Sequence, residues 1–78
     1  MQTARFAQSQ PLPTDLYRVY EATDPFHHGP FRLALRQSRE KRLLDDISSG
    51  RRLLSLGRVL LETRELTLAR AQAEALYL

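Results

Sequence analysis

Few residues of this chain have the type and spacing that catalysis or metal binding would need. His27 and His28 are the only histidines, and adjacent residues rarely bind one metal ion together. The chain has no cysteine, so a thiolate zinc site is excluded. Ser48-Ser49-Gly50 lacks the context of a phosphate-binding loop, because no strand is expected before it and no lysine follows it. The acidic residues are scattered, and we therefore expect no catalytic, metal-binding or cofactor-binding residue and no enzymatic activity.

The arginines are the second feature with chemical potential. Residues 29–58 contain eight basic and three acidic residues, and such a basic segment is typical of a polyanion-binding surface. Arg36–Glu40 and Arg42–Asp46 are spaced to form ion pairs on a helix, which reduces the charge available to phosphates. No known nucleic-acid-binding motif is present. Weakly specific nucleic-acid binding is thus the alternative function, and its possible polyanion-binding residues are Arg32, Arg36, Arg39, Arg51 and Arg52.

The apolar residues of the first half predict two helices. Thr14-Asp15 suits a helix start, and Leu16, Val19 and Tyr20 then form one apolar stripe that ends at Asp24-Pro25. Residues 24–29 read as a connector. A second helix is expected over about 30–48, because Pro30 suits a first helical position and Gly50 suits the residue after a helix. One bent helix over 30–78 is the alternative to a turn at 48–50.

The last third of the chain predicts a long helix over about 51–78. Leu54, Leu61 and Leu68 recur every seven residues, and a second apolar group falls on the opposite side. A helix with two apolar faces needs two surfaces to cover them. The second face is covered either by the N-terminal third of the same chain, which gives a closed three-helix monomer, or by another chain, which we favour. The expected partner-binding residues on this face are Val59, Leu66, Ala69, Ala73, Leu76 and Tyr77.

Length and composition point to a chain that acts with a partner. It has 78 residues, a formal net charge of +3, 42% hydrophobic and 27% charged residues, and no apolar run that could span a membrane. A domain this short buries a small core and often relies on a partner subunit. We therefore expect an all-α fold, with a flexible arm over 1–13 and one helical domain over 14–78, in which a short helix precedes an antiparallel helical hairpin. We also expect an oligomer.

The expected function follows from this fold class. The sequence favours a non-enzymatic, cytoplasmic module for protein–protein interaction, such as an adaptor or a regulator of the co-chaperone or anti-activator type. Its partner would be a protein helix, or a second copy of the chain, docked on the C-terminal helix. The apolar second face of that helix is the observation on which this expectation depends.

Overall fold

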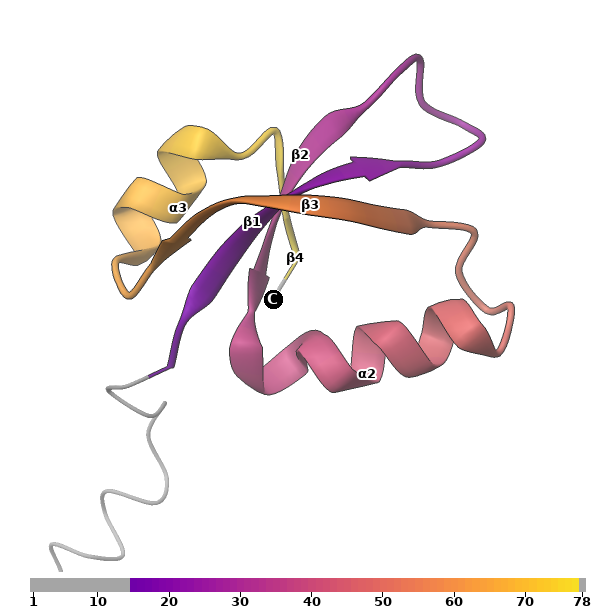
Figure 1. Ribbon diagram of the computed structural model, residues 1–78, viewed down its shortest axis with the longest axis horizontal. Coiled ribbons are helices and arrows are strands. Elements are labelled where there is room, and N and C mark those ends of the chain that lie inside the picture. Colours follow the sequence, from indigo (N-terminus) through magenta and orange to yellow (C-terminus); the bar gives the residue numbers. More distant parts are fainter. Residues whose placement is uncertain (1–14, 78) are drawn as a thin grey trace, which may run out of the picture.

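The computed structural model describes residues 15–77, which form a mixed sheet with a helix on each side (Figure 1). The strand order is β3-β1-β2-β4, in which β1 pairs antiparallel with β2 and with β3, and β2 pairs parallel with β4. The elements in chain order are β1 (Tyr17–Thr23), β2 (Phe31–Arg36), α2 (Gln37–Ser48), β3 (Ser55–Thr63), α3 (Leu66–Gln72) and β4 (Ala75–Tyr77).

The predicted all-α fold and its antiparallel helical hairpin are therefore wrong. The helix expected from residue 14 is strand β1, and the helix expected over 51–78 is replaced by β3, α3 and β4. The helix expected over 30–48 is correct only in its second part, because β2 precedes α2. Its end is placed correctly: α2 stops at Ser48, and Gly50 has a φ of 81° in the turn that follows. The arm expected over 1–13 lies outside the described residues.

Strand alternation explains why β1 and β2 bury residues on both sides. Successive side chains of a strand point to opposite faces of the sheet. In β1, Tyr17 and Val19 pack on one face, while Tyr20 and Ala22 pack on the other. Because both faces of these central strands are covered, their apolar residues show no simple alternation in the sequence. Spacing such as Leu16, Val19 and Tyr20 then imitates a helical stripe.

The core consists of two apolar clusters, one on each face of the sheet. We call the side covered by α2 the α2 face; its cluster contains Leu43 of α2 with Ala22 and three residues of β2. The opposite side, the α3 face, has Ala69 of α3 packed with Tyr17, Val19 and Ala34. Each helix thus contributes one buried side chain, since Leu43 and Ala69 are the buried residues of α2 and α3. The β2 residues of the first cluster are Phe31, Leu33 and Leu35.

The start of α2 is fixed by residues that precede β1. The Asp15 carboxylate accepts hydrogen bonds from the backbone N–H of Ser38, at 3.2 Å, and from its hydroxyl, at 2.8 Å. The backbone N–H of Gln37 also donates to the Leu16 carbonyl oxygen. These contacts satisfy N–H groups that have no partner within the helix, and a carboxylate is favourable at a helix N-terminus. Asp15 therefore caps α2 from outside the helix and ties it to the beginning of β1.

Candidate functional site

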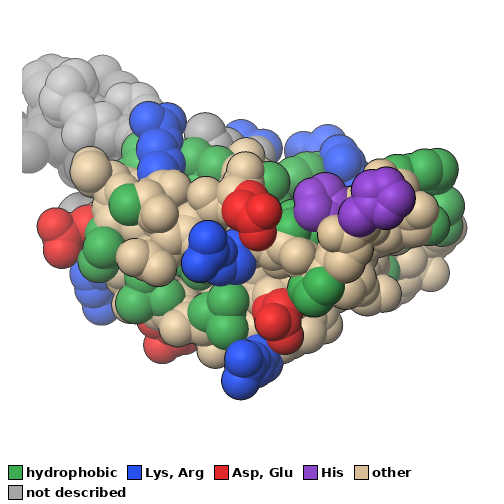
Figure 2. Space-filling view, turned by 90° about the horizontal axis from the view of Figure 1, so that it is seen from above, with side chains coloured by type: hydrophobic (Ala, Val, Ile, Leu, Met, Phe, Trp, Pro, Cys, Tyr) green, Lys and Arg blue, Asp and Glu red, His purple; other side chains and the backbone are tan. Residues whose placement is uncertain are grey.

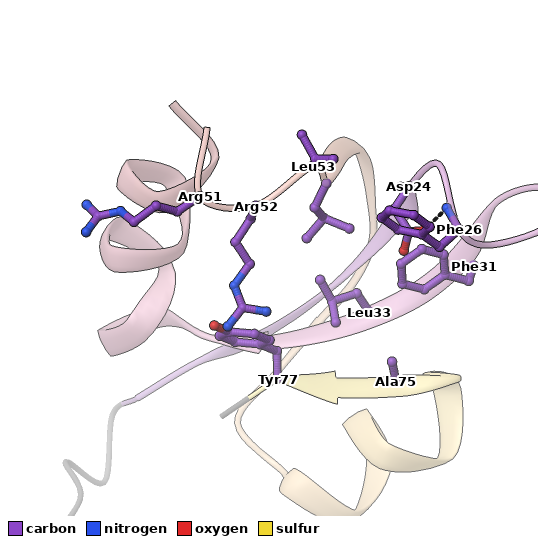
Figure 3. Close-up of a pocket in the computed structure, with 10 residues that line it drawn as sticks. Asp24, Phe26, Phe31, Leu33, Arg51, Arg52, Leu53, Ala75 and Tyr77 are labelled. Atoms are coloured by element: carbon purple, nitrogen blue, oxygen red, sulfur yellow. Dashed lines mark hydrogen bonds between the residues drawn. The ribbon is translucent and has the colours of Figure 1, made fainter. Parts of the chain in front are cut away.

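The α2 face holds an apolar cavity with a volume of about 460 Å³ (Figure 3). Its floor is formed by Phe31 and Leu33 of β2, with Ala75 and Tyr77 of the neighbouring β4. Its walls come from the tip of the β1–β2 hairpin and from the segment that joins α2 to β3. The volume lies in the range of small-molecule and peptide side-chain sites, about 300–1,000 Å³. The wall residues are Asp24, Phe26, Arg51, Arg52, Leu53 and Leu54.

Two large apolar side chains stand exposed at the mouth of this cavity. Phe26 is 85% exposed at the hairpin tip, and Leu53 is 61% exposed on the other wall. The tip is held in shape, because the Asp24 carboxylate accepts a 2.7 Å hydrogen bond from the backbone N–H of Phe26. The His27 ring packs against Phe31, with ring centroids 4.7 Å apart. Exposed apolar side chains beside a hollow are typical of an interaction site.

The polar groups of the cavity are mainly cationic. The Arg52 guanidinium lies over the Tyr77 ring, 4.7 Å from its centroid. Arg51 turns away from the cavity in Figure 3, where its Nε lies 3.6 Å from the Asp46 carboxylate and 3.0 Å from the Ser49 hydroxyl. Among the described residues, Arg52 has no ion pair with a carboxylate. Arg52 is therefore the charge that the cavity can offer to a ligand.

The lining combines an apolar floor with a cationic group at one end. An apolar side chain would fill the space above Phe31 and Leu33, and a carboxylate beside it would meet Arg52. The described residues of the lining include no serine, cysteine or histidine that a base could activate. Within residues 15–77, no group of three or more histidines, cysteines or acids is placed to hold a metal ion.

The six residues expected to bind a partner do not share one face. Leu66, Ala69, Ala73 and Leu76 belong to the cluster on the α3 face, where Ala69 is fully buried. Tyr77 packs on the opposite side of the sheet and lines the cavity, and Val59 lies exposed on β3. The helix that was to align these side chains is not formed. Of the six, Tyr77 alone lines the candidate site.

The five arginines expected to bind a polyanion are also separated. Arg36 precedes α2 and Arg51 follows it, so the 12 residues of the helix place them about 18 Å apart. The Arg36 guanidinium is engaged with the Tyr17 hydroxyl and lies over that ring. The backbone N–H of Arg32 is bound by the Glu74 carboxylate near the α3 face, while Arg39 is exposed on α2. Arg51 and Arg52 are adjacent after α2, at the opposite end of the helix from Arg36 and Arg39.

A second, smaller cavity of about 310 Å³ is lined mainly by charged residues. Glu21 and Arg58 face one another there at 3.7 Å, and Arg32 and Glu74 lie beside them. Figure 2 shows the molecule from the side of α3 and the hairpin, where charged side chains interrupt the apolar areas and the two histidines lie together at the surface. Opposite charges that already neutralise one another make this cavity the weaker candidate.

A network of ion pairs beneath the start of α2 is structural. Arg18 donates to Glu40 and to Glu62, each at 2.7 Å, and the Tyr20 hydroxyl donates to Glu40 at 2.7 Å. The Glu62 carboxylate and then the Glu40 carboxylate raise the pKa of Arg18, so the guanidinium stays charged. Burial, together with Glu40, raises the pKa of Tyr20 above its ordinary value. The network joins β1, β3 and α2, away from the cavity.

The raised pKa of Tyr20 predicts a loss of stability in alkali. The contribution is complete below about pH 10, the ordinary tyrosine pKa, and is lost as the pH rises through the higher folded-state value. Tyr20→Phe should cost about 1.5–3 kcal/mol at neutral pH, the net value of a hydrogen bond to a charged group such as the Glu40 carboxylate. The variant should then lose less stability than the wild type above about pH 10. Urea unfolding at neutral and alkaline pH measures the free energy of unfolding of both proteins. If the wild type and Tyr20→Phe lose the same free energy of unfolding above about pH 10, the Tyr20 hydroxyl is not responsible for the loss.

The sequence contained one local signal for the cavity, at Phe26, which the helical interpretation set aside. Phe26 stands in a proline- and glycine-rich connector, Asp-Pro-Phe-His-His-Gly, where an aromatic side chain has no core to enter. Leu53 follows Arg51-Arg52 directly after the expected turn. Phe26 thus had a local signal for exposure, and connecting segments often carry binding residues. Leu53 fell within the helix expected over 51–78, so its place on the segment between α2 and β3 was missed. The contribution of β4 had no comparable signal, because three residues are too few for a pattern.

Among the described residues, no helix combines the length and the apolar character needed to cross a membrane.

The chain was also compared with other proteins. Searches against protein-family models, curated proteins and solved structures find no match for this chain, so the interpretation of its site depends on the geometry given above.

Proposed function

We propose that this chain is a small non-enzymatic module that binds a protein partner, and that its apolar cavity receives a hydrophobic side chain of that partner. The cavity replaces the C-terminal helix face as the docking surface. The observation that carries the proposal is the exposure of Phe26 and Leu53 on opposite walls of the hollow. Fully burying an exposed leucine side chain is worth about 1.5–3 kcal/mol, so a partner that covers the exposed 61% of Leu53 would gain about 1–2 kcal/mol.

The basic charge at the mouth supports a partner with acidic residues. Arg52 is placed over Tyr77, where it can reach a carboxylate at the end of the cavity. Charge-assisted hydrogen bonds of this kind are stronger than neutral ones. The arginines do not favour nucleic acid as a ligand, because Arg36 and Arg51 lie at opposite ends of α2.

Selection from a random peptide display library tests the proposal. We expect the wild-type protein to enrich peptides that contain large apolar and acidic residues. Leu53→Asp should weaken their binding at least about tenfold, because a charge replaces the buried leucine contact. Leu68→Asp is the matched control: Leu68 is 39% exposed on α3, on the other face of the sheet, and this variant should bind as the wild type does. Peptides that bind Leu53→Asp equally well would contradict the proposal.

A further inference from the structure

We infer that the partner segment binds in an extended conformation, as an additional strand along the free edge of β4, with an apolar and an acidic side chain two residues apart over the cavity. This inference rests on the proposed function and specifies the partner. It also predicts which backbone groups of the partner take part. The partner is thus an acidic, apolar peptide segment of another protein rather than a helix.

The two edges of the sheet differ in their suitability for strand addition. β3 and β4 are the edge strands. The pairing of β3 with β1 contains two register shifts, between Val19 and Tyr20 and between Tyr20 and Ala22, whereas the described pairs of β4 with β2 contain none. Bulges bend an edge strand, increase its twist and so protect it from further pairing. The regular edge, beside β4, is the one that adjoins the cavity.

The orientation of β4 directs an added strand over the cavity. The side chains of Ala75 and Tyr77 line the cavity, while Leu76 packs on the α3 face. The backbone N–H of Glu74 donates to the Arg32 carbonyl oxygen, at 2.8 Å, and therefore points toward β2. The Arg32 backbone N–H and C=O both point to Glu74, so Ala34, two residues further along β2, also turns its backbone groups toward β4. In the parallel register Ala34 lies beside Leu76 and bonds to the residues on either side of it, so the N–H and C=O of Leu76 point to the free edge. A segment paired there would turn every second side chain toward the cavity.

The chemistry of the floor changes along β4. Ala75 lies beside Leu33 in the parallel register and has Phe31 near it in the cavity lining, so this end accepts an apolar side chain. Two residues further on, Tyr77 carries the Arg52 guanidinium above its ring, and this end accepts a carboxylate. The partner segment therefore needs a large apolar residue and an acid on the same face of a strand. Main-chain pairing would supply affinity and these two side chains specificity.

A second copy of the chain is a poorer occupant. Arg51 turns toward Asp46, so Arg52 is the cation that the described lining presents at the mouth, and the whole chain has a formal net charge of +3. Two copies meeting mouth to mouth would bring their Arg52 side chains together. Like charges opposed across an interface disfavour association.

Synthetic peptides that are methylated on alternate backbone nitrogens test the inference with an intact protein. The probes are short acetylated peptides with leucine and glutamate two positions apart, in both orders. Methylation on the alternate set of amides that faces β4 should weaken binding at least about tenfold, because each methyl removes a hydrogen-bond donor. Methylation on the other set should change it less than about threefold. Binding is measured by titration with NMR detection of the cavity residues.

A charge test accompanies the backbone test. Replacing the peptide glutamate by glutamine should weaken binding to the wild type several-fold. The same replacement should have no effect on binding to Arg52→Gln, because the partner of the carboxylate is then absent. Arg52 is exposed, so this variant should fold normally, which circular dichroism checks.

The outcomes separate this inference from the proposed function. Strand addition is refuted if the peptides methylated on either set of amides bind equally well. It is also refuted if the Leu53-dependent peptides from the display selection lack an apolar and an acidic residue two positions apart. In both cases the proposed function as a protein-binding module is unaffected. If the purified chain is a dimer by light scattering, and Leu53→Asp makes it a monomer, a second copy occupies the cavity and the inference is overturned. If no peptide depends on Leu53, both proposals fail together.

Discussion

Leu43→Ala should destabilise the protein by about 2–5 kcal/mol, the usual cost of emptying a buried leucine site. Leu43 is 1% exposed and is the buried residue of α2, where it packs with the β2 side chains on the α2 face. A domain of this size rarely has more than about 5 kcal/mol of stability. The variant should thus be partly or wholly unfolded, with the loss seen in urea unfolding followed by far-ultraviolet circular dichroism.

The neighbouring leucine provides the matched control. Leu44 is 45% exposed on the same helix, so Leu44→Ala removes the same atoms from a site that is already half in water. Its cost should stay below about 1 kcal/mol. Equal losses for the two variants would mean that α2 is not anchored through Leu43, and that the core on the α2 face is not organised as described.

Gly57→Val should destabilise the protein by about 1–3 kcal/mol, the range for an added side chain in a packed site. A Cβ atom at Gly57 would lie 3.0 Å from the backbone carbonyl oxygen of Glu21, which is closer than ordinary van der Waals contact. The obstacle is the backbone of β1, so relief requires the two strands to separate. The register shifts between β1 and β3 surround this point, which explains why glycine occupies it.

Thermal and urea unfolding of Gly57→Val measure the effect, with Ser55→Val as the comparison. Ser55 is exposed on the same strand, opposite Thr23, and valine there should be neutral or slightly stabilising because it favours strands. If Gly57→Val is as stable as the wild type, the close approach of β3 to β1 at this position is not required by the fold.

The sequence allowed a correct prediction only where local signals and tertiary structure agree. The end of α2 is such a place, because the serines and Gly50 form the turn after Ser48 and Gly50 has the positive φ that favours glycine. The connector over 24–29 does lie between two elements, at the tip of the hairpin. In both places the decisive residues are proline, glycine and serine, whose conformational preferences act within a few residues.

The remaining elements depend on contacts that the sequence pattern does not show. In β3, the two register shifts interrupt the alternation of apolar residues. Leu61 belongs to β3, whereas Leu54 precedes this strand and Leu68 lies on α3, so three separate segments imitate a helical repeat. Leucine, arginine and glutamate also favour helices locally, and pairing with β1 overrides that preference. Gly57 was the one signal against a helix, since an isolated glycine in an apolar strand often marks a bulge or a close backbone approach.

The candidate site was hidden for the same reason. Its residues come from the hairpin tip, the segment after α2, and the strands β2 and β4, which are distant in sequence. Arg52 and Tyr77 were both selected as binding residues, but for different surfaces and different ligands. The parallel pairing of β4 with β2 brings them together, and no periodicity within 75–77 predicts that pairing.

The position of β4 has a consequence for truncated forms of the chain. Ala75 and Tyr77 are among the last residues that the structure describes, yet they form part of the cavity floor. A chain that stops before β4 would lack this part of the floor. Under the proposed function, such a truncated product should not compete with the longer chain for the partner.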